Sequence, residues 1–163
     1  MEPRTLPKPL NERIPASPFP YHHYMRIQMR FNDFDMFGHM NNMSIMSFLD
    51  LGKVHYFQQV FGREIDPTEA AVVLANTNCT FVAPIMPPNR VEVYTTCLKV
   101  GTRSLTLEQR LVDMDTLQPY AISTTTLVGF DPATNKSADL RPDFIDSLSA
   151  FEHRNVRTTP ANS

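Results

Sequence analysis

One long stretch with helical periodicity, residues 41–62, stands among segments that otherwise show the patterns of β-strands. Within this stretch, mostly apolar residues recur every three or four positions, at Met46, Leu49, Lys53, Tyr56, Phe57 and Val60. About twenty residues at ~1.5 Å each make a rod of ~30 Å, long enough to cross a small sheet. A single sheet with one apolar face needs a cover, and only this helix is large enough to provide it.

Five strands are predicted around this helix. An alternating run at 24–31 precedes it, and four more runs follow at 70–82, 90–101, 104–113 and 119–131. The short links between the later runs favour antiparallel neighbours. Gly62 is expected to end the helix. Gly52 inside the helix costs about 1 kcal/mol relative to Ala, which close packing against the sheet would explain. A short helix is predicted within 139–153. The fold class is therefore α+β.

The first 23 residues are rich in proline, which locks the backbone and removes amide donors. They are expected to form an extended arm that drapes over the domain, drapes over a partner, or is disordered. The predicted organisation is an arm at 1–23, one domain at 24–153 and a tail at 154–163.

Composition excludes several classes of function. The net charge of −2 lacks the basic surplus of a nucleic-acid binder. No stretch approaches the ~18 consecutive apolar residues of a membrane span. Cys79 and Cys97 lie in strand-like runs and are interpreted as reduced thiols. The cytoplasm is therefore expected, and an acid-poor start gives the mitochondrial matrix as the alternative.

A dense group of polar residues around one glycine lies between the first strand and the long helix. Its members are Asp33, Asp35, Gly38, His39, Asn41 and Asn42. This motif, the element order and the segments 79–93, 100–111 and 121–131 resemble the 4-hydroxybenzoyl-CoA thioesterase-like family. The resemblance covers about residues 24–146. It implies a hot-dog fold, which is an antiparallel five-stranded sheet wrapped around a long central helix. It also implies an acyl-CoA thioesterase of lipid metabolism.

The chemistry of the motif agrees with this resemblance. An Asp, with a reference pKa of about 3.9, is ionised at neutral pH without tuning. Its carboxylate can attack a thioester carbonyl or deprotonate a water molecule. Both routes build negative charge on the carbonyl oxygen, which free amides at a helix N-terminus can stabilise. Gly38 allows a positive φ or a close backbone approach.

The resemblance also assigns roles to individual residues. Asp35 corresponds to the essential carboxylate, and the Asn42 backbone amide to the donor that polarises the carbonyl. His39 and Asn41 would support the loop, while Asn41 and Gly38 lie at the substrate. Arg103 and Ser104 match a basic residue followed by a serine that, in the family, contacts CoA. Arg is a strong hydrogen-bond donor to phosphate.

The expected assembly is a homodimer or a dimer of dimers, with each site at a subunit boundary, so Arg103 would serve a neighbour's site. CoA enters only as part of the substrate, and no cofactor is expected. No metal is expected either, because His22, His23 and His55 lack tight ligand spacing with His39.

Other interpretations remain open at this point. Asp33 is expected to be structural, and the Asn pair can act as turn and cap residues. Ile45 replaces a family Tyr, and Asp50 stands where Glu is frequent, so substrate choice is not predicted. An acyl carrier protein thioester is a second possible substrate. The alternatives are a non-catalytic hot-dog protein that binds an acyl thioester or a protein partner, and a dehydratase or hydratase.

Overall fold

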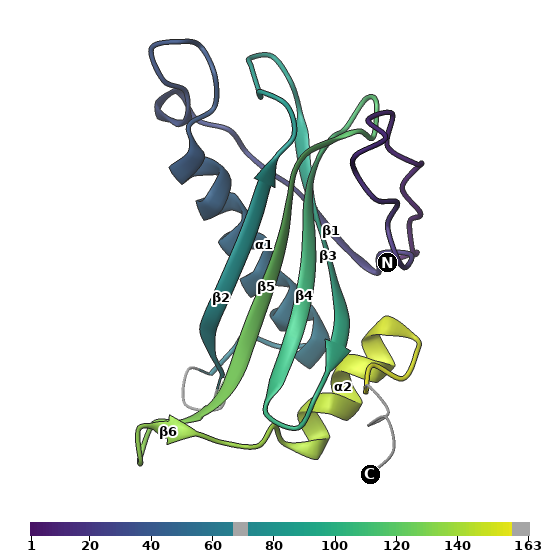
Figure 1. The fold of residues 1–163 in the computed structure, drawn as a ribbon, viewed down its shortest axis with the longest axis vertical. Helices are drawn as coiled ribbons and strands as arrows, with labels where there is room; N and C mark the ends of the chain where they lie inside the picture. The colour runs from purple at the N-terminus through teal and green to yellow at the C-terminus, as the bar shows by residue number, and fades with distance from the viewer. Residues whose placement is uncertain (67–71, 158–163) are drawn as a thin grey trace.

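An antiparallel sheet covered on one face by a long helix forms the body of the protein (Figure 1). The computed structural model describes residues 1–66 and 72–157, so the predicted positions 70–71 and 158–163 lie outside the described residues. The elements are β1 (His23–Arg26), a 3-10 turn (Phe31–Asp33), α1 (Asn42–Phe61), β2 (Val72–Phe81), β3 (Val91–Val100), β4 (Ser104–Asp113), β5 (Pro119–Asp131), β6 (Lys136–Ser137) and α2 (Pro142–Glu152).

The strands follow the order β1-β3-β4-β5-β2, and the short β6 pairs with β5. Every strand pair is antiparallel, which confirms the predicted α+β fold. The two-residue β6 is an addition that the sequence pattern does not predict. One edge of the sheet is β1 and the other is β2, so β2 pairs with β5 along one side only.

Helix α1 begins and ends where the sequence predicts. Asn41 is its N-cap, because the Asn41 side chain accepts a hydrogen bond from the Ser44 amide at 2.7 Å. Gly62 ends the helix with φ +68°, a left-handed conformation that glycine adopts without strain. At Gly52, an added Cβ would collide with the Val93 side chain in β3. Gly52 therefore lets α1 approach the sheet closely, as its position predicts.

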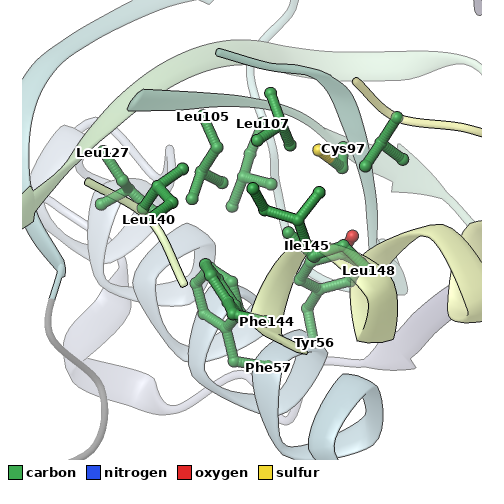
Figure 2. Packing of buried hydrophobic residues seen from close by; sticks show 12 residues of the cluster. Tyr56, Phe57, Cys97, Leu105, Leu107, Leu127, Leu140, Phe144, Ile145 and Leu148 are labelled. Atoms are coloured by element: carbon green, nitrogen blue, oxygen red, sulfur yellow. The ribbon is translucent and has the colours of Figure 1, made fainter. Parts of the chain in front are cut away.

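Two apolar clusters fill the space between α1 and the sheet. The first cluster joins the C-terminal half of α1 to β3, β4, β5 and α2. Figure 2 shows Ile145 and Leu148 of α2 close to strand residues Leu105 and Leu107, with Tyr56 of α1 below them. The second cluster lies under the N-terminal half of α1 and includes Ile45, Phe48, Leu49, Ile85, Val91, Val93 and Leu111. The two clusters fix α1 along the whole sheet.

The first strand is shorter than predicted. It ends at Arg26, although the alternating pattern continues to Phe31. The Ile27 amide still donates to the Val91 carbonyl at 3.0 Å, and Ile27 is buried. The chain then leaves the sheet for the 3-10 turn, so Phe31 is 94% exposed instead of facing the core. The turn forms because the Asp33 carboxylate accepts the Arg30 amide at 2.7 Å.

The N-terminal arm lies against β3 and β4 on the face opposite α1 (purple in Figure 1). Its ends are tied together by backbone hydrogen bonds between Arg4 and Tyr21, at 2.9 and 2.8 Å. The Tyr21 hydroxyl donates to Glu108 at 2.5 Å, and the Arg110 guanidinium donates to the Pro15 carbonyl at 2.9 Å. Of the three predicted states of the arm, it adopts the one that drapes over its own domain. The division of the chain at residues 23 and 153 stays a prediction.

Two further observations concern the described residues as a whole. None of their helices has both the length and the apolar character needed to cross a bilayer. Cys79 and Cys97 are both free thiols, as predicted, and burial raises the pKa of Cys97 to about 12.

Candidate active site

The loop between the 3-10 turn and α1 presents Asp35 to solvent. The Asp35 Oδ1 atom accepts hydrogen bonds from the Phe37 amide at 2.9 Å and the His39 amide at 3.3 Å. Gly38 has φ +77°, and its amide donates to the Asp35 carbonyl at 3.0 Å. Within the described chain, Asp35 Oδ2 has no hydrogen-bond partner. The turn therefore orients the carboxylate and leaves one oxygen available.

Asp33 is only two residues away, yet it occupies an interior position. Its side chain is 1% exposed and accepts from the Arg30 guanidinium at 3.0 Å and from the Ser44 hydroxyl at 2.9 Å. Its carbonyl also accepts the Asn41 amide at 2.8 Å. Burial alone would raise the pKa of Asp33, but the bonds from Arg30 and Ser44 lower it overall. Asp33 therefore ties the loop to the first turn of α1 and does not face a reactant.

The first turn of α1 leaves amides free beside this loop. The Ser44 and Ile45 amides are already bonded to the Asn41 side chain and carbonyl. The amides of Asn42 and Met43 have no acceptor among residues 1–66 and 72–157. They lie at the positive end of the helix dipole, where an oxyanion is stabilised. The sequence argument missed Met43, although the rule that the first helical amides lack intrahelical acceptors could have found it.

His39 contributes to the loop through its backbone rather than its ring. Its carbonyl accepts the Asp35 amide at 2.9 Å, and its own amide donates back to the Asp35 carboxylate. The loop is closed further by a backbone bridge between Phe34 and Met40. These contacts hold the Asp35 turn in shape without the imidazole.

Arg103 and Ser104 lie far from Asp35 within one chain. They belong to the β3–β4 hairpin, at the end of the molecule opposite the loop that precedes α1 (Figure 1). The 20 residues of α1 separate the two ends by about 30 Å. The Arg103 Nε atom donates to Asp139 at 2.8 Å, and both side chains are more than half exposed. The structure thus brings Asp35, Gly38, His39, Asn41 and Asn42 together but leaves Arg103 and Ser104 apart.

Strand β2, which is an open edge of the sheet, and helix α1 both expose large apolar side chains. Leu74 and Phe81 of β2 are 56% and 46% exposed, and Leu51 and Val54 of α1 are 51% and 48% exposed. On the Asp35 loop and the helix start, the exposed apolar side chains are Phe31, Met36, Phe37 and Met43. Isolated apolar residues on a surface are normal, but exposed large apolar side chains on an open edge strand are typical of an interaction site.

Comparisons with known proteins agree with this geometry. A sequence profile of the thioesterase-like superfamily matches residues 29–148. A thioesterase of Thermus thermophilus, crystallised in complex with coenzyme A and Zn, is 26% identical. That match covers 82% of this chain and 97% of the Thermus chain, with a TM-score of 0.72. PA2801, a putative thioesterase of Pseudomonas aeruginosa, is 29% identical over 80% of this chain and 97% of its own, with a TM-score of 0.68.

A Bacillus subtilis protein of unknown function, YsmA, is 29% identical over 84 residues. The match spans 52% of this chain and only 56% of YsmA. The superfamily profile is the broader finding, because it includes the Asp35 loop, the whole of α1 and all four long strands. This chain therefore belongs to the thioesterase-like superfamily and has its hot-dog fold.

Proposed function

We propose that this protein is an acyl-CoA thioesterase, which hydrolyses an acyl-CoA to a free acid and CoA. One observation carries the proposal. The exposed Asp35 carboxylate lies on the loop that precedes α1, and the backbone amides of Asn42 and Met43 at the start of α1 have no acceptor among the described residues. The coenzyme A complex of the Thermus thioesterase supports the choice of thiol. An acyl carrier protein thioester is the second substrate class, and the cytoplasm is the proposed compartment.

The proposed reaction follows one of two routes from Asp35. As a general base, the carboxylate removes a proton from water, and the hydroxide adds to the thioester carbonyl. As a nucleophile, the carboxylate adds directly and forms an anhydride, which water then hydrolyses. In both routes the C–S bond breaks, and the CoA thiolate leaves with the bonding electron pair. The thiolate then takes up a proton. The carbonyl oxygen carries negative charge toward the Asn42 and Met43 amides. No cofactor takes part in either route.

We further propose that the working unit is a homodimer formed along β2. The unpaired edge of this ten-residue strand offers backbone donors and acceptors to a second copy. The exposed Leu74 and Phe81 would be buried by the same contact. A twofold axis across two antiparallel β2 strands places opposite ends of the subunits side by side. Arg103 of one subunit then approaches the Asp35 loop of the other.

The experiment that tests this function compares Asp35→Asn and Asp35→Ala with wild type. Thiol release is measured with a panel of acyl-CoAs of different chain length and with an aromatic acyl-CoA. Both variants are expected to lose at least about a hundredfold in kcat while remaining folded, because a positioned base or nucleophile contributes that much. Asp146→Asn is the matched control, since Asp146 is an exposed acid of α2.

Wild-type rates in both Asp35 variants would overturn the assignment of this residue. If wild type binds acyl-CoA without releasing thiol, the non-catalytic alternative holds instead. With an α,β-unsaturated acyl-CoA as substrate, a product that keeps the thioester and has water added across the double bond would indicate the hydratase alternative.

A further inference from the structure

Four of the five histidines in the chain meet at the end of α1 that lies away from Asp35. His22 ends the arm, His23 begins β1, His55 lies in the C-terminal half of α1, and His153 is the C-cap of α2. We name these four residues the histidine cluster. The cluster joins three parts of the chain that are distant in sequence. The fifth histidine, His39, lies on the Asp35 loop.

His22 and His153 form the outer pair of the cluster. Their rings stack with centroids 4.6 Å apart and an angle of 15° between planes. The His22 ring also meets the edge of Phe151, with centroids 6.4 Å apart. Both burial and the neighbouring His153 lower the pKa of His22. The stack is favourable while at least one ring is neutral, but two imidazolium rings at this separation would repel each other.

His23 and His55 form the inner pair. The Nε2 atom of His23 lies 2.9 Å from the Nδ1 atom of His55, so a single proton sits between them. His23 is fully buried, and among the described residues its Nδ1 atom has no partner. If His23 became doubly protonated, its Nδ1 atom would become a buried donor with no acceptor among the described residues. Such a donor is unfavourable, so His23 resists protonation.

Water reaches the cluster through a cavity of about 810 Å³ that His22, His55 and His153 line together with Glu64. The other charged groups that face the cluster are Arg63, the α-amino group of Met1, and the pair Glu152 and Arg154. No three His, Cys, Asp or Glu side chains in the described ranges are arranged to hold a metal.

We propose that the histidine cluster is a proton-sensitive clamp, which holds the N-terminal arm and the C-terminal end of α2 against α1 and releases them on acidification. The clamp acts at a distance from the proposed active site and does not depend on the proposed function. Its contacts are the His22–His153 stack and the His23–His55 hydrogen bond.

The direction of the pH effect follows from proton linkage. Burial and the adjacent His55 lower the pKa of His23 to about 3 from an ordinary value of 6.5. Between these two values the released state binds a proton that the closed state does not, so the closed state loses stability as pH falls. Each histidine that behaves in this way shifts the equilibrium toward release by up to about tenfold per pH unit. Above pH 6.5 the clamp is closed and insensitive to pH.

The test is hydrogen exchange of the full-length protein at about pH 7.5 and about pH 5.5, with detection by mass spectrometry. These values lie on either side of the ordinary histidine pKa. The exchange rates are corrected for the intrinsic pH dependence of exchange. Protection is read in peptides from residues 1–26 and 143–157, with β4 as the internal reference. The double variant His22→Phe and His23→Gln removes the two histidines whose pKa is lowered in the closed state. Phe keeps a ring against His153, and the Gln side-chain amide can donate to the His55 Nδ1 atom in place of the His23 Nε2 atom.

In wild type, exchange of both segments is expected to rise at least about tenfold more than in the double variant when pH falls from about 7.5 to about 5.5. His39→Gln, the matched control, should keep the wild-type pH response. Equal protection of wild type at both pH values would overturn the proposal. Release of the double variant to the same extent as wild type would also overturn it, because the acid response would then come from groups other than the two replaced histidines. If the double variant does not fold at the higher pH, His22→Phe alone makes the same comparison.

Discussion

At the scale of single residues, Asp33 and Asp35 show how environment separates two acids of one motif. Asp33 is enclosed by donors from Arg30 and Ser44, whereas Asp35 faces solvent and is oriented only by loop amides. The motif position predicts the reacting role for Asp35. It does not reveal that Asp33 bonds to Ser44, because that contact depends on how α1 is placed relative to the loop.

We predict that Asp33→Asn destabilises the protein while leaving the Asp35 carboxylate in place. The amide would lose the charge-assisted bond from the Arg30 guanidinium and weaken the bond from the Ser44 hydroxyl. The expected loss is about 2 kcal/mol in the free energy of unfolding. Urea denaturation of wild type and variant measures it. A difference below about 0.5 kcal/mol, which is ordinary for surface changes, would contradict the anchoring role.

The same residue gives a prediction for acid stability. The pKa of Asp33 is lower in the folded protein than its ordinary value of 3.8. Its stabilising contribution is therefore complete above pH 3.8 and is lost as pH falls through the lower folded value. The difference between wild type and Asp33→Asn should shrink on acidification below pH 3.8. A difference that stays constant from about pH 7 to about pH 3 would show that the carboxylate charge does not contribute.

At the scale of elements, sequence periodicity predicts α1 and the strands β3, β4 and β5 closely. Apolar spacing, the cap at Asn41 and the stop at Gly62 are local signals, and the structure follows them. The pattern fails for β1, because alternation continues to Phe31 while the backbone has already left the sheet. At that exit the Asp33 carboxylate accepts hydrogen bonds from Arg30 and stabilises the 3-10 turn. The two residues of β6 are too few to carry a pattern.

Gly52 tests the contact between α1 and the sheet. Helix propensity alone predicts that Gly52→Ala stabilises the protein by about 1 kcal/mol. The structure predicts the opposite, because the added methyl would collide with Val93 and lie 3.3 Å from the Gln109 Nε2 atom. That amide also donates to the Leu49 carbonyl at 2.8 Å, so displacement would break a buried bond. We expect a loss of about 1–3 kcal/mol, as for overpacked cores.

Thermal and urea unfolding measure this effect, with Ser47→Ala as the control at an exposed position of the same helix. If Gly52→Ala raised the free energy of unfolding as an exposed glycine replacement does, the close approach of α1 and β3 would be wrong.

At the scale of the whole molecule, the residues of the proposed active site are divided between the two opposite ends of the folded subunit. Asp35 and Arg103 lie at opposite ends, so one subunit cannot place both on one acyl-CoA. In the twofold dimer that we propose, Arg103 would reach the neighbour's site. We predict that Asp35→Asn and Arg103→Ala each have low activity alone. Refolded together in equal amounts, they should recover about a quarter of wild-type activity, because half of the dimers carry one intact site.

Thiol release by the refolded mixture measures this recovery, and sedimentation confirms the dimer. Separate refolding of each variant, followed by mixing without exchange, is the control and should show no recovery. Absence of recovery in the co-refolded dimer would place Arg103 outside the neighbour's site.

Long-range placement is also the part of the molecule that sequence reasoning leaves unsolved. Proline content predicts an extended arm, but its position depends on Tyr21 reaching Glu108, 87 residues away. The histidine cluster gave no spacing signal, because His153 is almost one hundred residues from His55. Such contacts follow from the fold and not from local pattern.

The strand order has a consequence for how the chain folds. Strands β3, β4 and β5 are consecutive and adjacent, so they can assemble through short loops, whereas β1 and β2 attach at opposite edges through contacts of longer separation. We expect the central hairpins to form early and the outer strands to join later. During synthesis, β2 emerges before β5 exists to pair with it, so this apolar strand depends on a later segment for protection.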